Sequence, residues 1–270
     1  MKMSNTATRI LVSVIAIPAI VLTCYFGKYY FFVFVLFIGL LSYYEFWAFA
    51  KKKSANANLV IGLIAVGFII LNVYKNLIEF YLLFVILLLL LTLIELFNKK
   101  GSAIFNLGST LLGILYFGLF SSALILLREF YFLDYLRGGL LIIAILASIW
   151  ICDSAAFFGG TALGKHKLFP RVSPNKSWEG ATFGLLFAIL TMIVSKLLIL
   201  DFLTWMDIIV IGLIVGVVGQ IGDLVESLFK RDAGIKDSSK LIPGHGGVFD
   251  RFDSLLFTAP AVYIYLKYLT

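Results

Sequence analysis

The sequence has little charge and few of the residues that bind soft metals. Only 14% of its 270 residues are charged, whereas 61% are hydrophobic, and the mean hydropathy is +1.04. A soluble domain of this length needs many more polar residues to cover its surface. Because the chain has only two cysteines and two histidines, a disulfide framework and a zinc site are both disfavoured. The composition therefore predicts an integral membrane protein.

Long apolar runs are what the sequence has in abundance. They are continuous, as in "YLLFVILLLLLTLIELF" at 81–97, whereas a membrane β-barrel alternates in segments of about ten residues. We therefore expect an all-α, polytopic integral membrane protein with about nine transmembrane helices. The first run is interpreted as a retained span, because no small-residue cleavage site follows it. The expected helix cores are 10–26, 30–50, 59–74, 79–97, 104–127, 139–158, 180–200, 206–225 and 254–269.

The lysines and arginines predict the orientation of these spans. Sixteen of the 22 fall on the side that holds the N-terminus, and six fall on the other side. Because cytoplasmic loops carry the excess of basic residues, the N-terminus is expected in the cytoplasm and the C-terminus outside. The same excess explains most of the formal net charge of +7, so no nucleic-acid partner is expected.

Two connections are longer and more polar than the others, and both are expected on the cytoplasmic face. They cover about 159–179 and 226–253, and each holds one of the two histidines, His166 and His245. We therefore expect a C-terminal catalytic transmembrane region at 139–270, with about four spans. The preceding residues, 1–138, are expected to form about five spans that serve as a scaffold.

The end of the eighth span, "GQIGDLVESLFKRD" at 219–232, places ionisable residues in or beside the membrane. Asp223 and Glu226 are costly there, and such residues are typically functional. On a helix, Ser227, Lys230 and Arg231 follow the three-and-four spacing that defines one face. Positive-inside residues at a helix end are an alternative explanation for the two basic residues, but not for Asp223.

The stretch "HGGVFDRFDS" at 245–254 combines a glycine turn with two aspartates. Glycines reach positive φ cheaply and let other groups approach closely. Asp250 and Asp253 are three residues apart where the ninth span begins, near a helix N-terminus that favours bound phosphate, and Arg251 lies between them. As an alternative, Asp253 or Ser254 is a helix N-cap.

Carboxylates at these positions suit a hard divalent cation. Mg²⁺ prefers carboxylate oxygens and usually binds one or two of them together with substrate phosphates. Asp223 and Asp250 meet that need if the eighth and ninth spans pack as an antiparallel hairpin. Asp253 is a candidate for an additional ligand, and the sequence leaves open whether a second cation joins the first.

A third polar stretch, "CDSAAFFGGTALGKHKLFPRVSPNKSWEG" at 152–180, adds further candidates. Asp153 lies near the membrane boundary, and "SPNKSWEG" is typical of a turn followed by a helix start between Ser177 and Gly180. The stretch also offers cations suited to a triphosphate or a lipid phosphate, namely Lys165, Lys167, Arg171 and Lys176.

The run from Ser227 to Asp253 strongly resembles the signature of the phosphatidate cytidylyltransferases, or CDP-diacylglycerol synthases. That signature reads S-x-x-K-R, four residues, K-D, a short gap, P-x-H-G-G and D-R-x-D. "SPNKSWEG" and "DSAAFFGG" are also similar to stretches of this family, and the motifs cover about a fifth of the chain. Every fixed position is met, by Ser227, Lys230, Arg231, Lys236, Asp237, Pro243, His245, Gly246, Gly247, Asp250, Arg251 and Asp253.

The resemblance implies an enzyme that transfers CMP from CTP to phosphatidic acid with Mg²⁺, giving CDP-diacylglycerol and diphosphate in phospholipid biosynthesis. It also implies a homodimer in the cytoplasmic (inner) membrane of a bacterium, with the active site on the cytoplasmic face. Catalytic roles are expected for Asp223, Asp250, Lys176, Lys230 and Arg231. Substrate binding is expected at Asp153, Ser173, Asn175, Ser227, Lys236, Asp237, His245, Gly246, Gly247 and Arg251.

Two other functions fit parts of the pattern. A CTP-dependent lipid kinase shares related membrane motifs but transfers the γ-phosphoryl group. A polytopic, ion-coupled transporter could use Asp153, Asp223 and Glu226 as an ion relay. It would not require the P-x-H-G-G and D-R-x-D motifs in a cytoplasmic loop, so the cytidylyltransferase interpretation is favoured.

Overall fold

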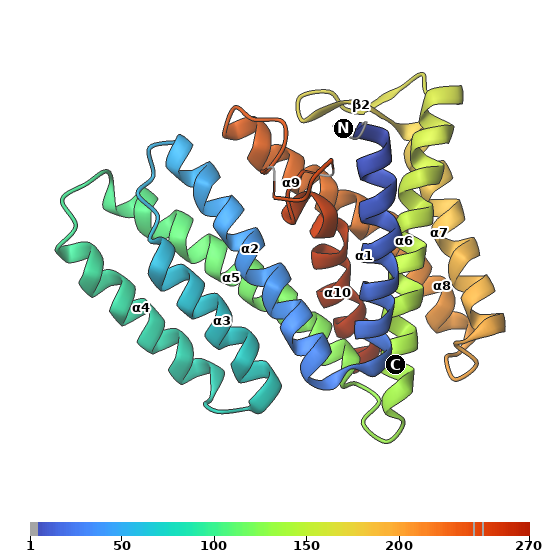
Figure 1. Ribbon diagram of the computed structural model, residues 1–270, viewed down its shortest axis with the longest axis horizontal. Helices are drawn as coiled ribbons and strands as arrows, with labels where there is room; N and C mark the ends of the chain where they lie inside the picture. The colour runs from blue at the N-terminus through green and yellow to red at the C-terminus, as the bar shows by residue number, and fades with distance from the viewer. Residues whose placement is uncertain (1–4, 240, 245) are drawn as a thin grey trace.

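The computed structural model describes residues 5–239, 241–244 and 246–270 as a bundle of helices (Figure 1). Apolar runs without internal glycine or proline clusters favour helix, because a helix satisfies every backbone hydrogen bond within itself. The first half of the chain forms α1 (Asn5–Phe26), α2 (Lys28–Lys52), α3 (Leu59–Lys75), α4 (Phe80–Leu96) and α5 (Ala103–Arg128).

The second half adds longer helices and one small sheet. Helix α8 continues through a π-helical turn, η1, into α9, so that the three form one rod. Strands β1 and β2 pair as an antiparallel hairpin between α6 and α7. The elements are α6 (Tyr135–Leu163), β1 (Lys167–Phe169), β2 (Ser173–Ser177), α7 (Trp178–Leu198), α8 (Trp205–Ile214), η1 (Val215–Gly219), α9 (Gln220–Asp232) and α10 (Phe249–Tyr268).

This architecture confirms an all-α membrane protein, and each expected helix core lies on a helix or on the α8–α9 rod. Six of the described helices are long and apolar enough to cross a membrane, and α3 and α4 are shorter apolar helices. Many large apolar side chains of α1 and α4 are exposed, as lipid-facing surfaces require. These exposed apolar surfaces are consistent with helices that contact lipid.

The two polar connections are shorter than predicted. Helix α6 continues to Leu163, α9 continues to Asp232, and α10 begins at Phe249, ahead of its apolar run. The first connection also contains the β1–β2 hairpin rather than only a turn. The added part of α9 includes good helix formers such as Lys230 and Arg231, whereas α6 and α10 are extended through weak helix formers such as Gly160 and Asp250. A window based on hydropathy therefore ends these helices too early.

Helix α10 lies at the centre of the bundle, where it contacts α2 and α5 of the first half as well as α6, α8 and α9. Phe249, at its start, is buried and meets Phe117 of α5 edge to face at 4.9 Å. In Figure 1, α10 runs from the end that carries the hairpin to the opposite end. Both halves of the chain thus surround the helix that carries the D-R-x-D motif.

Helices α9 and α10 pack against each other, and the predicted metal site depends on this contact. Their contact is close at Gly222, where a Cβ atom would lie 2.8 Å from the carbonyl oxygen of Asp253. Any larger residue would separate the two helices. Glycine at this position lets the two helices approach closely, so the acidic residues of both helices lie near one another.

Candidate active site

A cavity of about 640 Å³ opens at the end of the bundle that carries the β1–β2 hairpin. Its walls come from α6, the hairpin, α7, α9, α10 and the connection before α10. The fold therefore brings the three polar stretches of the sequence together in one place. The predicted site residues that line the cavity are Asp153, Asn175, Lys176, Asp223, Lys230, Asp237, Asp250, Arg251 and Asp253.

The hairpin delivers Lys176 to this cavity. Ser177 ends β2 and caps α7, at the helix start that the sequence predicts, by accepting a hydrogen bond of 3.2 Å from the backbone N–H of Gly180. Lys176, the residue just before the cap, places its Nζ 2.5 Å from Oδ2 of Asp223 on α9. An N-cap and a short strand thus hold a lysine opposite an acidic helix face.

The π-helical turn before α9 decides which residues face the cavity. A π turn holds more residues than an α turn, so the side chains that follow it are rotated about the helix axis, and such turns often occur at functional sites. Gln220, which lines the cavity, donates hydrogen bonds to the carbonyl oxygens of Gly216 and Ala181. This side chain ties the turn to α7.

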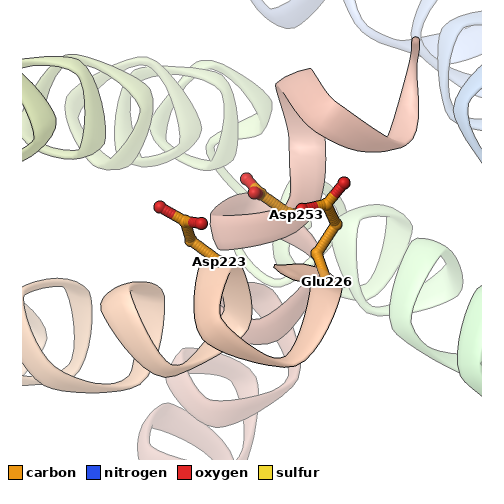
Figure 2. A group of neighbouring side chains, drawn as sticks. All are labelled: Asp223, Glu226 and Asp253. Carbon is orange, nitrogen blue, oxygen red and sulfur yellow. The ribbon is translucent and has the colours of Figure 1, made fainter. Parts of the chain in front are cut away.

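Three carboxylates meet where α9 and α10 cross (Figure 2). One oxygen from each of Asp223, Glu226 and Asp253 lies within 4.8 Å of the others. Glu226 is only 1% exposed, and its Oε1 has no hydrogen-bond partner among the described residues. Its Oε2 pairs with Lys230 Nζ at 2.7 Å. A buried carboxylate oxygen without a partner is costly, and a cation would satisfy it.

Asp250 is not part of this group. Its Oδ1 lies 2.8 Å from Lys230 Nζ, and its Oδ2 accepts hydrogen bonds from the backbone N–H groups of Ser238 and Gly247 at 3.0 and 2.9 Å. The Ser238 hydroxyl lies 2.9 Å from the same oxygen. Asp250 therefore holds the connection before α10, and its predicted role as a metal ligand stays a prediction.

The cavity wall carries an excess of negative charge. Among the described residues, six carboxylates line it, whereas the cationic side chains there are Lys176, Lys230 and Arg251. The two lysines are paired with carboxylates, and Arg251 is exposed with no ion pair among the described residues. Such a wall repels phosphate anions unless cations join it, so its chemistry fits a site for a divalent cation.

Several predicted residues lie away from the cavity. Arg231 donates to the carbonyl oxygens of Val172 and Ile235, so it joins the hairpin to the end of α9. Ser227 donates to Asp223 at 3.4 Å. Ser173, Lys236, Gly246 and Gly247 are likewise outside the cavity wall.

Two further predictions concern the start of α10. His245 falls outside the described residues. The alternative in which Asp253 or Ser254 caps the helix is wrong, because α10 begins at Phe249 and both residues lie within it. The helix starts early because a carboxylate from another helix, Glu45 of α2, accepts hydrogen bonds from its first backbone N–H groups.

The sequence does not reveal the contact between Glu45 and the connection before α10. It is 1% exposed and lies beside the connection before α10, although about two hundred residues separate the two in sequence. The sequence signal that could have found this residue is a lone carboxylate inside the apolar run "SYYEFWAF". Such a carboxylate indicates a buried, functional position, but the sequence does not show which residues it contacts.

Comparison with known proteins shows the family of this chain. The model of the "Cytidylyltransferase family" matches residues 7–269. A phosphatidate cytidylyltransferase of Bacillus subtilis is 32% identical over 98% of both chains. One from Haemophilus influenzae is 42% identical over 49% of this chain and 47% of its own, and one from Staphylococcus aureus is 46% identical over 44% and 45%. This chain therefore belongs to the cytidylyltransferase family.

Proposed function

We propose that this protein is a phosphatidate cytidylyltransferase that converts CTP and phosphatidic acid into CDP-diacylglycerol and diphosphate. The observation that carries the proposal is a single cavity that gathers the acidic pair of helices α9 and α10, Lys176 and Arg251 at one end of a membrane bundle. The names of the similar proteins from three bacteria support the same reaction.

The reaction is a substitution at phosphorus. An oxygen of the lipid phosphomonoester bonds to the α-phosphorus of CTP, and the bond from that phosphorus to the α–β bridging oxygen breaks. The electron pair of the broken bond leaves with diphosphate. Because the second pKa of a phosphomonoester is about 6, the attacking group is already mostly dianionic at neutral pH and needs no strong general base. The main barrier is the repulsion between two anions.

Residues of the chain would position both phosphates and reduce that repulsion. Arg251 is exposed at the cavity, so its guanidinium is free to bind phosphate oxygens in a bidentate manner. Lys176 and Lys230 would stabilise the charge that develops on diphosphate. Phe157 of α6 lines the cavity and is 65% exposed, so a lipid head group could arrive from the bilayer while CTP arrives from water.

We propose that Mg²⁺ binds between Asp223, Glu226 and Asp253. The unpartnered Oε1 of Glu226 and the negative excess of the wall support this assignment. When bound, the ion would offset the charge of the triphosphate. Asp250 remains the alternative ligand, and a second cation at this wall remains part of the proposal.

The membrane topology is also a proposal. We infer nine spans with the N-terminus in the cytoplasm, because α10 and the two shorter apolar helices would join the six long ones, and because basic residues gather at one side. The cavity would then face the cytoplasm, in the inner membrane of a bacterium. Residues 139–270 would carry catalysis, and 1–138 would provide scaffold, lipid access and the contact of a homodimer, which rests on family resemblance.

The decisive experiment is a turnover assay with purified protein, labelled CTP and phosphatidic acid, with and without Mg²⁺. We expect CDP-lipid and diphosphate only when Mg²⁺ is present. CDP and a phosphorylated lipid would instead identify a CTP-dependent lipid kinase. Ion transport by reconstituted protein without CTP turnover would favour the transporter and refute the proposal.

A further inference from the structure

We infer that Glu45 of α2 is a positioning residue of the active site, which holds the connection before α10 and, through Ser238, sets the place of Asp250. The expected effect of Glu45 on turnover rests on the proposed function. Its role in holding the connection before α10 rests on contacts between described residues. It would give the first half of the chain a direct role in the geometry of the site.

The contacts of Glu45 all lead to one short segment. Its Oε1 accepts hydrogen bonds from the backbone N–H of Val248 at 2.9 Å and from the Ser239 hydroxyl at 2.5 Å. Its Oε2 accepts from the backbone N–H of Phe249 at 2.8 Å and lies 2.9 Å from the Ser238 hydroxyl. The carboxylate therefore acts as an N-cap for α10 that is supplied by another helix.

Charge explains why this contact is strong. Glu45 is 1% exposed and has no basic partner within ion-pair distance among the described residues. A buried carboxylate without a cation needs several donors. The first N–H groups of α10 are such donors, and the helix dipole favours negative charge at that end. Removing the charge would release the start of α10 together with the segment before it.

Ser238 transmits the position of Glu45 to Asp250. Its hydroxyl lies 2.9 Å from Glu45 Oε2 and 2.9 Å from Asp250 Oδ2, and its single proton is donated to one of them at a time. Asp250 in turn pairs with Lys230, which also pairs with Glu226 of the carboxylate group. A continuous series of contacts thus runs from α2 to the proposed metal site.

Gly247 shows how tightly the segment is packed on Glu45. A Cβ atom at this position would lie 1.8 Å from the Ser238 hydroxyl oxygen and 2.4 Å from Glu45 Oε1. Only glycine leaves room for the backbone here. The second glycine of the P-x-H-G-G motif is thereby explained by Glu45 and Ser238, although it does not line the cavity.

The test compares Glu45→Gln with Glu95→Gln as a matched control. Glu95 is also in the first half and accepts hydrogen bonds from Asn98 and Asn106, with no contact to the site. An amide oxygen can replace only part of the Glu45 contacts, and its NH₂ group would face other donors. Because a small displacement of active-site groups costs up to about 100-fold in rate, we expect kcat to fall roughly 100-fold, with a smaller change in the KM for CTP.

Two further measurements separate positioning from general damage. Hydrogen–deuterium exchange of peptides covering 238–250 should quicken in Glu45→Gln and not in Glu95→Gln. In a double-mutant cycle, Glu45→Gln and Ser238→Ala should be non-additive in kcat, because both break the same link to Asp250. Additive effects, or a Glu45→Gln enzyme with at least half the wild-type kcat, would overturn the inference.

The exchange measurement also keeps this inference separate from the proposed function. If the wild-type protein makes no CDP-lipid, the proposed function fails, while faster exchange in Glu45→Gln alone would still support the anchoring of the segment. If Glu45→Gln does not fold, Ser238→Ala tests the link by itself. A lowered kcat in that variant supports the inference, and an unchanged kcat refutes it.

Discussion

Two charged side chains, Arg128 and Glu226, are buried near opposite ends of the bundle, and their polar atoms differ in how fully they are hydrogen-bonded. Arg128, at the end of α5, is 0% exposed and donates to the carbonyl oxygens of Cys24, Tyr25 and Tyr135. Its guanidinium also lies 3.9 Å from the centre of the Tyr135 ring. Glu226, beside the cavity, keeps one oxygen without a partner among the described residues.

The difference is the one expected between a charge that stabilises the fold and a charge that binds a ligand. Arg128 joins the ends of α1 and α5 to the start of α6, and each of its three side-chain nitrogens donates to a backbone oxygen. Glu226 lies against a cavity whose wall has more carboxylates than cations. Buried polar groups are normally satisfied, so an unpartnered carboxylate oxygen next to a cavity supports the proposed cation site. The following predictions test this comparison.

The largest effect is expected at the carboxylate that both the sequence and the structure select. Asp223→Asn should lower turnover about 1000-fold, because it removes a charge that would stabilise the transition state through the bound cation. CDP-lipid formation by purified protein measures the effect. Asp232→Asn is the matched control, since Asp232 is on the same helix but pairs with Lys53 at the surface. Near-normal turnover in Asp223→Asn would refute the metal assignment.

Arg128 should matter for stability instead of catalysis. Arg128→Met removes three hydrogen bonds to backbone carbonyl oxygens, at roughly 1 kcal/mol each, so the protein should lose about 3 kcal/mol of stability. Thermal unfolding in detergent measures this loss, with Arg137→Met as the exposed control. Turnover per folded molecule should stay close to that of the wild type. A large loss of turnover at unchanged stability would contradict the structural role.

Glu226 and Asp250 can be distinguished by their Mg²⁺ dependence. Glu226→Gln should raise the Mg²⁺ concentration for half-maximal turnover about tenfold, because it weakens the proposed ion site. Asp250→Asn should mainly lower kcat, since Asp250 holds the connection before α10. Titration of turnover with Mg²⁺ compares the two. A larger shift in Asp250→Asn would instead make Asp250 the ligand that the sequence predicts.

Arg231 should give the smallest effect, although the family signature includes it. Its side chain binds the carbonyl oxygens of Val172 and Ile235 at the surface. Arg231→Gln should therefore change kcat by no more than about twofold, as expected for a partly exposed substitution away from the site. Steady-state kinetics with CTP checks this. A tenfold loss would restore Arg231 as a phosphate-binding residue.

The helices were largely predictable, but their ends were not. Hydropathy located each span, because burial of apolar side chains in lipid is a property of the sequence window itself. It missed the polar end of α9 up to Asp232 and the start of α10 at Phe249. Those turns are helical because of caps and neighbours, including Glu45, which no local window contains.

The sequence predicted many of the residues of the candidate site, but it did not predict how their side chains are arranged around the cavity. The motifs selected Lys176 and Asp253, the cost of an ionisable residue in a span selected Asp223, and all three line the cavity. The motifs also selected Lys230 and Arg231 together, yet neighbouring residues on a helix point about 100° apart, and only Lys230 faces the cavity. Asp250 accepts hydrogen bonds from Ser238 and Gly247, whereas Glu226 keeps one oxygen without a partner among the described residues, and this difference depends on tertiary contacts.

The sequence by itself determined a helical membrane protein with its chemistry in two polar segments, because hydropathy and residue chemistry are local properties. Only the tertiary structure decided which carboxylates meet and which are already satisfied. It also brought Glu45 against a segment that follows it by about two hundred residues. Such contacts depend on how α2, α9 and α10 pack, and packing is a property of the whole chain.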